Sequence, residues 1–477
     1  MSSKSVIVAG GGLAGLSSAV ALASAGWRVR LFEQRPFLGG RATSYVLPSG
    51  EHVDNCQHVT FGCCTNLEDF YKRVGAADKI KFYDRLVLQD PQGRRATMRA
   101  GILPAPFHFT GSFLNFAPLS LADKLGIARA MLAILRNRGE VDAPQGTSML
   151  DWLHAQNQSP AAIERFWKAV LVSALSDELD RIDVRYGVMV FWKSVLANKT
   201  GYRMGVPAVA LSELYDGCRR EIEKRGGEVV FRAPVRRLKL ENGAVAGIIL
   251  DENRKESADA YVVALPHEIL AEILSPEAVA MDSGLANLKR IEDASITGVH
   301  LWFDRVVMDE PYLTLLETMT QWIFNKTALY ASANGNRPEA AAQQYLQLVI
   351  SSSNALLQKS RQEIIEVCLE EVRRALPRAR DARVVKATVI KEATATFSPL
   401  PGVDHWRPPQ KTQISRLYLA GDFTATGWPA TMEGAVRSGY LAAEAVLRDA
   451  GTPRQFLQPD LPVAPLVKLL SRAPTKS

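Results

Sequence analysis

Cysteine is scarce in this sequence, and its spacing excludes two kinds of site. The 477 residues contain five cysteines, and no two of them have CxxC spacing. Because the number is odd and this spacing is missing, the sequence indicates neither a disulfide framework nor a zinc site. We therefore expect buried thiols in a reducing cytoplasm, and no bound metal.

Long apolar runs and a strong net charge are missing as well. No run of the ~18 apolar residues that suggests a membrane-spanning helix is present. After MSSK the chain continues directly into a strand-like segment, so we expect no signal peptide. The net charge of +7, spread over 477 residues, is too weak to indicate a nucleic-acid partner. The simplest location is the cytoplasm, with peripheral contact at the inner face of the cell membrane as a further option.

A glycine motif lies between two strand-like segments near the amino terminus. SVIVA at 5–9 and WRVRLFE at 27–33 have the length and apolar composition of strands. Gly10, Gly12 and Gly15 lie between them as GxGxxG, followed by a helical pattern. This context predicts a dinucleotide site, because the glycines permit a tight turn, close approach of a pyrophosphate and close packing of the helix on the strand.

Two further groups complete the predicted nucleotide site. The N-terminus of the helix after Gly12 offers free N–H groups and a partial positive charge to the phosphates. Glu33 ends the second strand-like segment about 20 residues beyond the glycines, where a carboxylate binds ribose hydroxyls. No second GxGxxG occurs, so we expect no separate NAD(P)H domain. Electrons must then come from, or go to, a substrate or an external partner.

A second motif lies near the carboxy terminus. RLYLAGD at 416–422 is predicted to be a strand that ends in Gly421 and Asp422. A helix is predicted to begin near Thr431, and small residues such as Gly439 on its inner face suit close packing against another helix.

The middle of the chain shows weaker patterns. A helix is predicted over 211–225, and an Asn-Gly pair at 242–243 predicts a hairpin. Residues 100–138 hold four phenylalanines and an amphipathic helix with basic flanks, typical either of a bilayer surface or of a core helix. FWKAVLVSAL and GVMVFWKSVL have the composition to line an apolar tunnel. We expect the Pro-rich tail within 451–477 to be loosely ordered.

The segment after Glu33 and the carboxy-terminal motif bear on which cofactor binds, through their resemblance to a known family. RPFLGGRATS and the carboxy-terminal LYLAGDFTATGWPATMEGAV resemble the flavin-binding family that includes amine oxidases and carotenoid desaturases. The resemblance implies FAD and an α/β fold, with a Rossmann-type FAD-binding domain of the glutathione-reductase type and an interleaved α+β substrate domain. Two or three domains also suit a chain of 477 residues. The implied FAD-binding domain comprises 1–60, 205–275 and 410–450, and the substrate domain comprises 61–204 and 276–409.

The resemblance also implies which residues contact FAD. An arginine after two glycines suits the diphosphate, and Val235 would contact the adenine. Asp422 would bind the ribityl-phosphate end, and the helix that begins near Thr431 would face the ring, where its N-terminus stabilises negative charge. The full set is Gly10, Gly12, Leu13, Ala14, Gly15, Glu33, Gln34, Gly39, Gly40, Arg41, Gln57, His58, Val235, Gly421, Asp422, Thr431 and Met432.

A polar stretch, VDNCQHVTFG, matches a narrower branch of the family. Its D-N-x-Q-H pattern resembles the bacterial hydroxysqualene dehydroxylases, in which this strand lies beside the flavin ring. That resemblance implies that Gln57 or His58 bonds the flavin edge and that Asp54 or His58 donates a proton. The alternative is that Asp54 braces a strand and that His58 is a structural histidine. Cys56 stands where that branch commonly has glycine.

The resemblance implies reductive removal of the allylic hydroxyl of hydroxysqualene, giving squalene for hopanoid synthesis. Carotenoid or phytoene desaturation is the first alternative, and amine oxidation the second. A polyisoprenoid-binding protein that keeps FAD for structure only is an alternative of another class. The expected substrate is a long apolar isoprenoid, and the sequence leaves the electron donor and the oligomeric state open.

Overall fold

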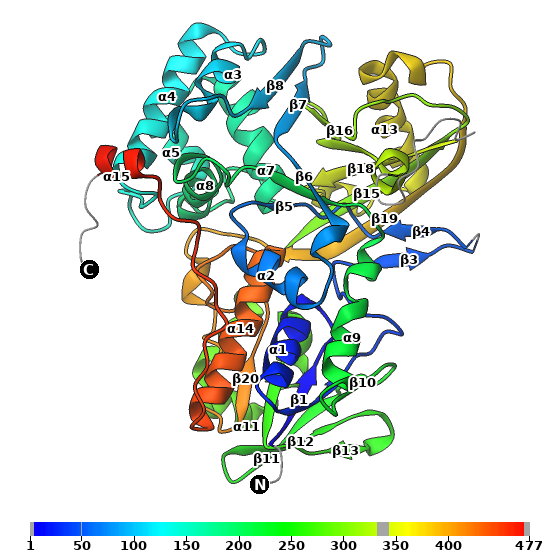
Figure 1. The fold of residues 1–477 in the computed structure, drawn as a ribbon, viewed down its shortest axis with the longest axis vertical. Helices are drawn as coiled ribbons and strands as arrows, with labels where there is room; N and C mark the ends of the chain where they lie inside the picture. The colour runs from blue at the N-terminus through cyan, green and yellow to red at the C-terminus, as the bar shows by residue number, and fades with distance from the viewer. Residues whose placement is uncertain (1–3, 49, 332–342, 472–477) are drawn as a thin grey trace.

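The computed structural model of the protein describes residues 4–48, 50–331 and 343–471. Figure 1 shows two lobes, and the lower lobe contains both the first strand and the last long helix. Its centre is a five-stranded parallel sheet with the order β10-β2-β1-β14-β20. The strands are Ser5–Ala9 (β1), Arg28–Phe32 (β2), Glu228–Val230 (β10), Ala260–Val263 (β14) and Leu417–Leu419 (β20).

Successive side chains of β1 point to opposite faces of the parallel sheet, and each face is covered by another layer. Val6 and Val8 belong to the core beneath α1 (Leu13–Ser24), α9 (Asp216–Glu223) and α14 (Met432–Asp449). Ile7 and Ala9 belong to another core cluster, which includes residues of a second, three-stranded sheet. Its strands are Arg237–Glu241 (β11), Ala244–Ile249 (β12) and Lys255–Glu256 (β13).

Helices α1 and α14 lie side by side because α14 has a glycine where they touch (Figure 1). A Cβ on Gly439 would lie 2.0 Å from Ser17 Oγ and 2.3 Å from the carbonyl oxygen of Ala14. Ser17 Oγ donates a hydrogen bond to the carbonyl of Val436 at 3.3 Å. The close helix packing predicted from small residues is therefore confirmed, and it joins the two ends of the chain.

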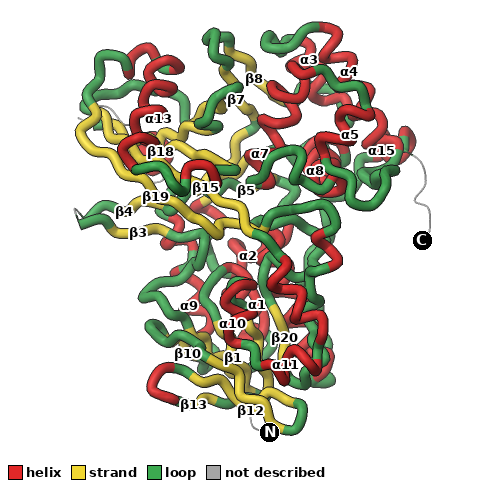
Figure 2. Tube along the Cα trace, turned by 180° about the vertical axis from the view of Figure 1, so that it is seen from behind, coloured by secondary structure: helices red, strands yellow, loops and turns green. Residues whose placement is uncertain are grey.

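The upper lobe combines a seven-stranded sheet with a group of helices (Figure 2). The strand order is β19-β15-β18-β17-β16-β7-β8. One face packs on α13 (Arg361–Ala375) through residues such as Ile364 and Val372. The strands are Arg85–Gln89 (β7), Arg95–Arg99 (β8), Asp293–Phe303 (β15), Tyr312–Leu315 (β16), Trp322–Asn325 (β17), Gln344–Ser351 (β18) and Val384–Phe397 (β19).

The helices beside this sheet include two π-helical turns, at Ile163–Lys168 and Trp192–Leu196. Such turns are frequent at functional sites. Among the described residues, no helix combines the length and apolar character needed to cross a membrane. The helices are Thr110–Leu114 (α3), Leu121–Arg136 (α4), Met149–Ala155 (α5), Pro160–Ala162 (α6), Ala169–Leu175 (α7), Val184–Phe191 (α8) and Pro465–Leu470 (α15).

Short elements complete the fold, several of them between the lobes. The strands are Ser44–Val46 (β3), His52–Asp54 (β4), Thr60–Phe61 (β5), Ile80–Tyr83 (β6) and Met204–Pro207 (β9). The helices are Thr65–Arg73 (α2), His267–Ile273 (α10), Pro276–Met281 (α11) and Lys326–Ala331 (α12).

The helix predicted over 211–225 is in fact divided. A 3₁₀ turn at Leu211–Leu214 precedes α9. The reason is that the N–H of Leu211 donates to Asp54 at 3.0 Å, so the first turn is fixed by another part of the chain. By contrast, the hairpin predicted at Asn242–Gly243 is confirmed, with both residues at positive φ as a two-residue hairpin turn requires.

The expectation of a loosely ordered tail is wrong for residues up to 471. Phe456 is buried and packs its ring against Tyr440. The N–H of Gln458 donates to the side chain of Asn66 at 2.8 Å. Apolar burial and side-chain hydrogen bonds thus hold this Pro-rich segment against α14 and α2, although it is mostly without regular structure.

Candidate cofactor and substrate site

The turn between β1 and α1 has the shape of a phosphate cradle. A Cβ on Gly15 would lie 1.9 Å from the carbonyl oxygen of Gly10, so only glycine lets the helix pack on this turn. A Cβ on Gly12 would meet nothing closer than Gly40 Cα at 3.7 Å. The helix that follows has no side-chain cap and no acidic residue in its first turn. Open space therefore adjoins an uncapped helix N-terminus, which suits a pyrophosphate.

Glu33 lies at the end of β2, as the motif requires. Its side chain is buried and accepts hydrogen bonds from the N–H groups of Gly11 and Arg35, each at 2.7 Å. Each carboxylate oxygen keeps lone pairs for a ribose hydroxyl. The carbonyl of Glu33 accepts from Ala233 at 2.9 Å, which places the buried Val235 segment beside it, whereas Gln34 is exposed. The predicted adenosine contacts therefore adjoin each other, apart from the outward-facing Gln34.

The two sequence motifs meet at an ion pair. Arg41 Nη2 lies 2.5 Å from Asp422 Oδ1, although the two residues are 381 positions apart. Gly39 and Gly12 form an isolated bridge, so the Gly39–Arg41 segment lies against the phosphate cradle. The structure thus brings the amino-terminal and carboxy-terminal motifs to one edge of the parallel sheet, where ligands bind in folds of this kind.

The N-terminus of α14 forms the other end of this site. Thr431 Oγ1 caps the helix by accepting from the N–H of Gly434 at 3.0 Å. Glu433, in the first turn, accepts from the N–H of Leu67 at 2.8 Å and from Asn66 Nδ2 at 2.9 Å. Burial raises the pKa of Glu433 despite these bonds. Thr431, Met432 and Glu433 all line a large cavity.

That cavity has a volume of about 600 Å³ and an almost wholly apolar lining. It extends from Trp428 and Met432, at the N-terminus of α14, to Phe107 and Leu132, which are partly exposed at the surface. Residues of both segments predicted to line an apolar tunnel do line the cavity. The first segment overlaps the π-helical turn at Ile163–Lys168, and the second contains the turn at Trp192–Leu196. Further lining residues are Leu86, Met98, Phe109, Phe113, Met131, Phe166, Val170, Met189, Phe191, Tyr202, Trp322 and Phe324.

The polar side chains around Asp54 form hydrogen bonds and an ion pair with other residues of the protein. Asp54 is fully buried, and Lys326 Nζ, also fully buried, lies 2.7 Å from its Oδ2. The hydroxyl of Ser44 and the N–H of Leu211 donate to Oδ1 at 2.7 and 3.0 Å. Although burial alone would raise the pKa of Asp54, Lys326 holds it below its usual range.

This placement does not support Asp54 as a proton donor. Asp54 is not among the residues that line the cavity, and an ionised, fully bonded carboxylate has no proton to give. The bracing role named as the alternative fits the geometry. Lys326 also donates to Gln57 Oε1 at 2.8 Å, and Asn55 Nδ2 lies 3.4 Å from Glu392, so the stretch joins the lobes.

His58 and Cys56 are also unsuited to the reactive roles considered for them. His58 Nδ1 lies 3.0 Å from the carbonyl of Cys56, which can only accept, so Nδ1 carries the proton. Burial lowers the pKa of His58, so at neutral pH its Nε2 is an acceptor. Burial also raises the pKa of the Cys56 thiol to about 12, which leaves it protonated and a poor nucleophile. Gln57, Val59, Thr60 and Phe61 of this stretch do line the cavity.

Sequence reasoning missed Lys326, because a single lysine after a strand carries no pattern. The only signal was indirect, since buried polar groups at 54–57 require partners. It also missed a cluster of His267, Glu268 and Asp293, whose ligand-type atoms lie within 4.8 Å of one another. Burial raises the pKa of Asp293 to about 6. These three residues are contributed by α10 and β15, so their proximity arises only in the fold.

Comparison with known proteins places this site in a family. The sequence matches the family described as flavin containing amine oxidoreductase over residues 13–447. The chain belongs to this family. It is thus an FAD-dependent oxidoreductase with a Rossmann-type FAD-binding domain, and the uncapped cradle, Glu33 and the end of α14 fit FAD.

Relatives cover nearly the whole chain. The 15-cis-phytoene desaturase of Solanum lycopersicum is 28% identical over 93% of this chain and 78% of its own. The zeta-carotene desaturase of Synechocystis sp. is 26% identical over 93% of this chain and 97% of its own. Among solved structures, an oxidoreductase from Methanosarcina mazei superposes with a TM-score of 0.70 at 20% identity, covering 93% of this chain and 100% of that one. Putrescine oxidase superposes with a TM-score of 0.68 at 17% identity, covering 94% and 99%.

Two glycine variants should separate FAD binding from folding. Gly12→Ala should fold normally, because its Cβ meets only Gly40 Cα at 3.7 Å, yet it should fill space next to the helix N-terminus. FAD affinity should fall at least about tenfold, since a hydrogen bond to a charged group contributes about 1.5–3 kcal/mol. Gly15→Ala should instead lower the melting temperature of the apoprotein, because its Cβ clashes with Gly10. Flavin fluorescence titration and thermal unfolding measure these effects; unchanged FAD affinity in Gly12→Ala would contradict the cradle.

The buried ion pair should respond to mutation and to pH. Lys326→Met should lower the free energy of unfolding by about 3–5 kcal/mol, because it leaves a buried carboxylate unpaired. Adding Asp54→Asn to that variant should recover part of the loss. In the wild type, the stabilisation by Asp54 is complete above its unfolded pKa of about 4 and is lost as pH falls through the lower pKa of the folded state. Urea unfolding across this range tests both points, and a double variant less stable than Lys326→Met would oppose this account.

Proposed function

We propose that this FAD-dependent oxidoreductase acts on a long apolar isoprenoid. The observation that carries the proposal is the cavity, whose apolar lining connects the end of α14 with the protein surface. A chain of isoprene units fits a long space whose lining is almost wholly apolar. The phytoene and zeta-carotene desaturases among the relatives support the same substrate class.

Two directions of reaction suit this cavity. The D-N-x-Q-H pattern and the carboxy-terminal segment favour reductive dehydroxylation of hydroxysqualene to squalene. The desaturase relatives, similar over 93% of the chain, favour dehydrogenation of a phytoene-like substrate as the second candidate. We place dehydroxylation first because this reaction needs a proton donor, and the carboxylic acid Glu433 lies in the first turn of α14 and lines the cavity.

In dehydroxylation, the allylic hydroxyl takes up a proton and leaves as water, and a hydride then adds to the allylic cation. Reduced FAD supplies the hydride when bound. The apolar lining keeps water away from the cation. Among the described residues that line the cavity, Glu433 is the one carboxylic acid, and its pKa is raised by burial. Glu433, which lines the cavity whereas Asp54 does not, therefore replaces Asp54 as the proposed proton donor. The N–H groups of Asn66 and Leu67, together with Arg437 at 3.5 Å, would stabilise the carboxylate it becomes.

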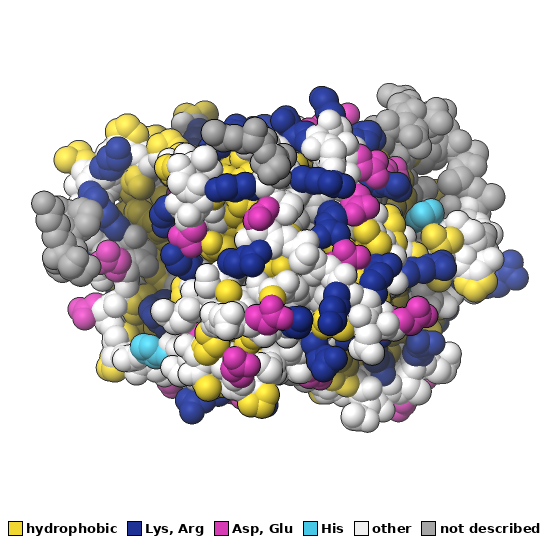
Figure 3. Space-filling model, turned by 90° about the horizontal axis from the view of Figure 1, so that it is seen from below, with side chains coloured by type: hydrophobic (Ala, Val, Ile, Leu, Met, Phe, Trp, Pro, Cys, Tyr) yellow, Lys and Arg dark blue, Asp and Glu magenta, His cyan; other side chains and the backbone are white. Residues whose placement is uncertain are grey.

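The cavity reaches the surface within an apolar patch, and we propose that this patch rests on a membrane. The patch consists of the exposed side chains of Ile102, Leu103, Phe107, Leu114, Leu121, Leu125 and Leu132, of which Phe107 and Leu132 also line the cavity. The basic residues Arg129 and Arg136 are exposed on α4, the helix that carries Leu121, Leu125 and Leu132. At the opposite end of the molecule, acidic and basic side chains are interspersed (Figure 3). A substrate dissolved in a bilayer could thus enter without crossing water.

Substrate identity is tested with anaerobic, dithionite-reduced holoprotein and hydroxysqualene. Reoxidation of the flavin together with squalene formation supports dehydroxylation. Bleaching of the oxidised flavin by phytoene supports desaturation. If neither compound changes the absorbance of the flavin, the result supports a binding protein. Glu433→Gln should lower the rate of squalene formation about 100-fold or more, the usual effect of losing a general acid. Glu68→Gln, at a half-exposed acid on α2, is the control and should react normally.

Membrane contact is tested by sedimentation with vesicles that contain an anionic phospholipid. Replacing both Leu121 and Leu125 by serine should weaken binding at least about tenfold, because burying one leucine contributes about 1.5–3 kcal/mol. Val46→Ser, an exposed apolar residue on β3, is the control and should bind like the wild type. Equal binding of all three proteins would exclude the patch as the contact.

A further inference from the structure

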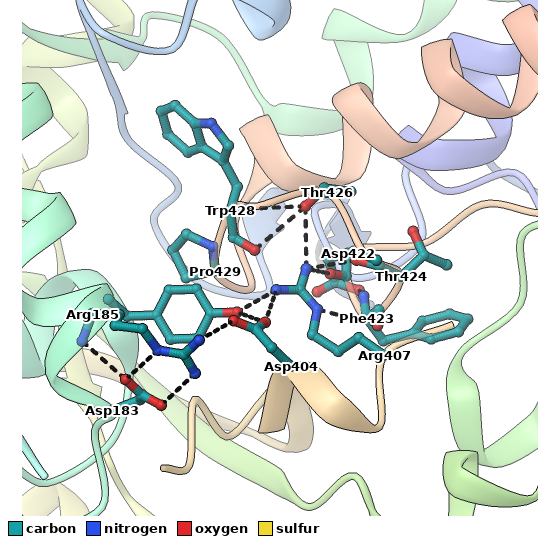
Figure 4. A network of polar contacts seen from close by, with 12 residues as sticks. Asp183, Arg185, Asp404, Arg407, Asp422, Phe423, Thr424, Thr426, Trp428 and Pro429 are labelled. Atoms are coloured by element: carbon teal, nitrogen blue, oxygen red, sulfur yellow. Dashed lines mark hydrogen bonds and ion pairs between the residues drawn. The ribbon is translucent and has the colours of Figure 1, made fainter. Parts of the chain in front are cut away.

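A buried arginine lies behind the loop that follows β20. Arg407 comes shortly after a 3₁₀ turn at Val403–His405, and its side chain is 1% exposed. Residues 421–429, here named the cofactor loop, run from β20 to the start of α14 and include Asp422, the partner of Arg41. Figure 4 shows the guanidinium of Arg407 pointing into the curve of this loop.

Arg407 is bonded to three successive peptide carbonyls of the cofactor loop. Its Nη2 donates to the carbonyls of Asp422 at 2.9 Å and Thr424 at 2.6 Å, and its Nε donates to Phe423 at 3.4 Å. Nη2 also donates to Thr426 Oγ1 at 3.1 Å. The same hydroxyl accepts from the N–H of Trp428 at 3.2 Å. One planar guanidinium thus fixes the loop from its first residues almost to its last.

The other end of the guanidinium is bonded to α8, a helix of which other residues line the cavity. Nη1 donates to the hydroxyl of Tyr186, on α8, and to Asp404 Oδ1 at 3.0 Å. Tyr186 in turn donates to Asp404. Burial raises the pKa of Tyr186, so its hydroxyl keeps this proton at neutral pH. Since Met189 and Phe191 of the same helix line the cavity, Arg407 connects the cavity wall with the cofactor loop.

We propose that Arg407 is the positioning residue for the flavin site, and that it acts through the cofactor loop. The loop places Asp422 opposite Arg41 and leads directly into Thr431, the cap of α14. A loop displaced from Arg407 would therefore move both the phosphate end and the ring end of the site. This role goes beyond the proposed function, because it concerns the cofactor and does not depend on the substrate.

Lysine cannot replace Arg407 in this role. Three peptide carbonyls, two hydroxyls and a carboxylate oxygen accept from the guanidinium in directions that match a planar fork. An ammonium has three donors around a single point and cannot reach both the loop and Tyr186. The ring of Phe397 also packs under the guanidinium, at 4.9 Å, which suits a flat cation.

The test compares Arg407→Lys with Arg185→Lys in purified protein. Arg185 lies in the same network, but it contacts Asp183 and Asp404 and no residue of the cofactor loop. Arg407→Lys should bind FAD at least tenfold more weakly, and the midpoint potential of its bound flavin should become more negative, because the N-terminus of α14 then stabilises reduced flavin less. Arg185→Lys should keep the wild-type affinity and potential.

A milder variant and a second readout keep the proposal open to refutation. Thr426→Val removes the hydroxyl that links Arg407 with Trp428, and it should shift FAD affinity and potential in the same direction by a smaller amount, even if Arg407→Lys does not fold. A purely structural arginine would lower the melting temperature of the apoprotein and leave the flavin potential unchanged. That result, or a folded Arg407→Lys that binds FAD within twofold of the wild type, would overturn the proposal.

Discussion

Parallel pairing of strands from remote parts of the chain is the constraint on which the cofactor site depends. β1 lies between β2 and β14, and β20 lies beyond β14, so the carboxyl ends of these strands meet at one edge. The segments that follow them carry Gly12, Glu33 and Asp422 to that edge. The pairing is possible because α14 approaches α1 at Gly439, where any side chain would collide with Ser17.

Buried polar groups between the lobes also hold distant parts of the chain together. Two of them are satisfied by partners from distant parts of the chain: Asp54 by Lys326, and Glu433 by the N-terminus of α2. Removing one partner leaves a buried charge or acceptor without a bond, which costs more than the bond contributed. These pairs therefore fix the cavity relative to the end of α14, and hence the proposed substrate relative to FAD.

Apolar side chains, unlike these polar groups, extend from the interior of the protein to its surface. The mostly apolar lining of the cavity extends from the N-terminus of α14, past residues of the two π-helical turns, to Phe107 and Leu132 in the exposed patch. The buried face of α4, with Ile127 and Ala130, packs on the core, whereas Leu121 and Leu125 face outward. The buried face matches the expectation of a core helix, and the exposed leucines belong to the patch that we propose as the membrane contact.

The sequence by itself determined the local elements and the cofactor class. The glycine motif, Glu33, the hairpin at 242–243 and the helix after Thr431 follow from rules of backbone geometry that act over a few residues. The tertiary structure alone decided that Asp54 is paired with Lys326, that Glu433 adjoins the cavity and that Arg407 supports the cofactor loop. Asp54 resembled a catalytic acid because its sequence neighbours are polar, while the lysine that ionises it is 272 positions away. Protonation and access depend on charges and packing close in space, and no short-range pattern records which distant residues will provide them.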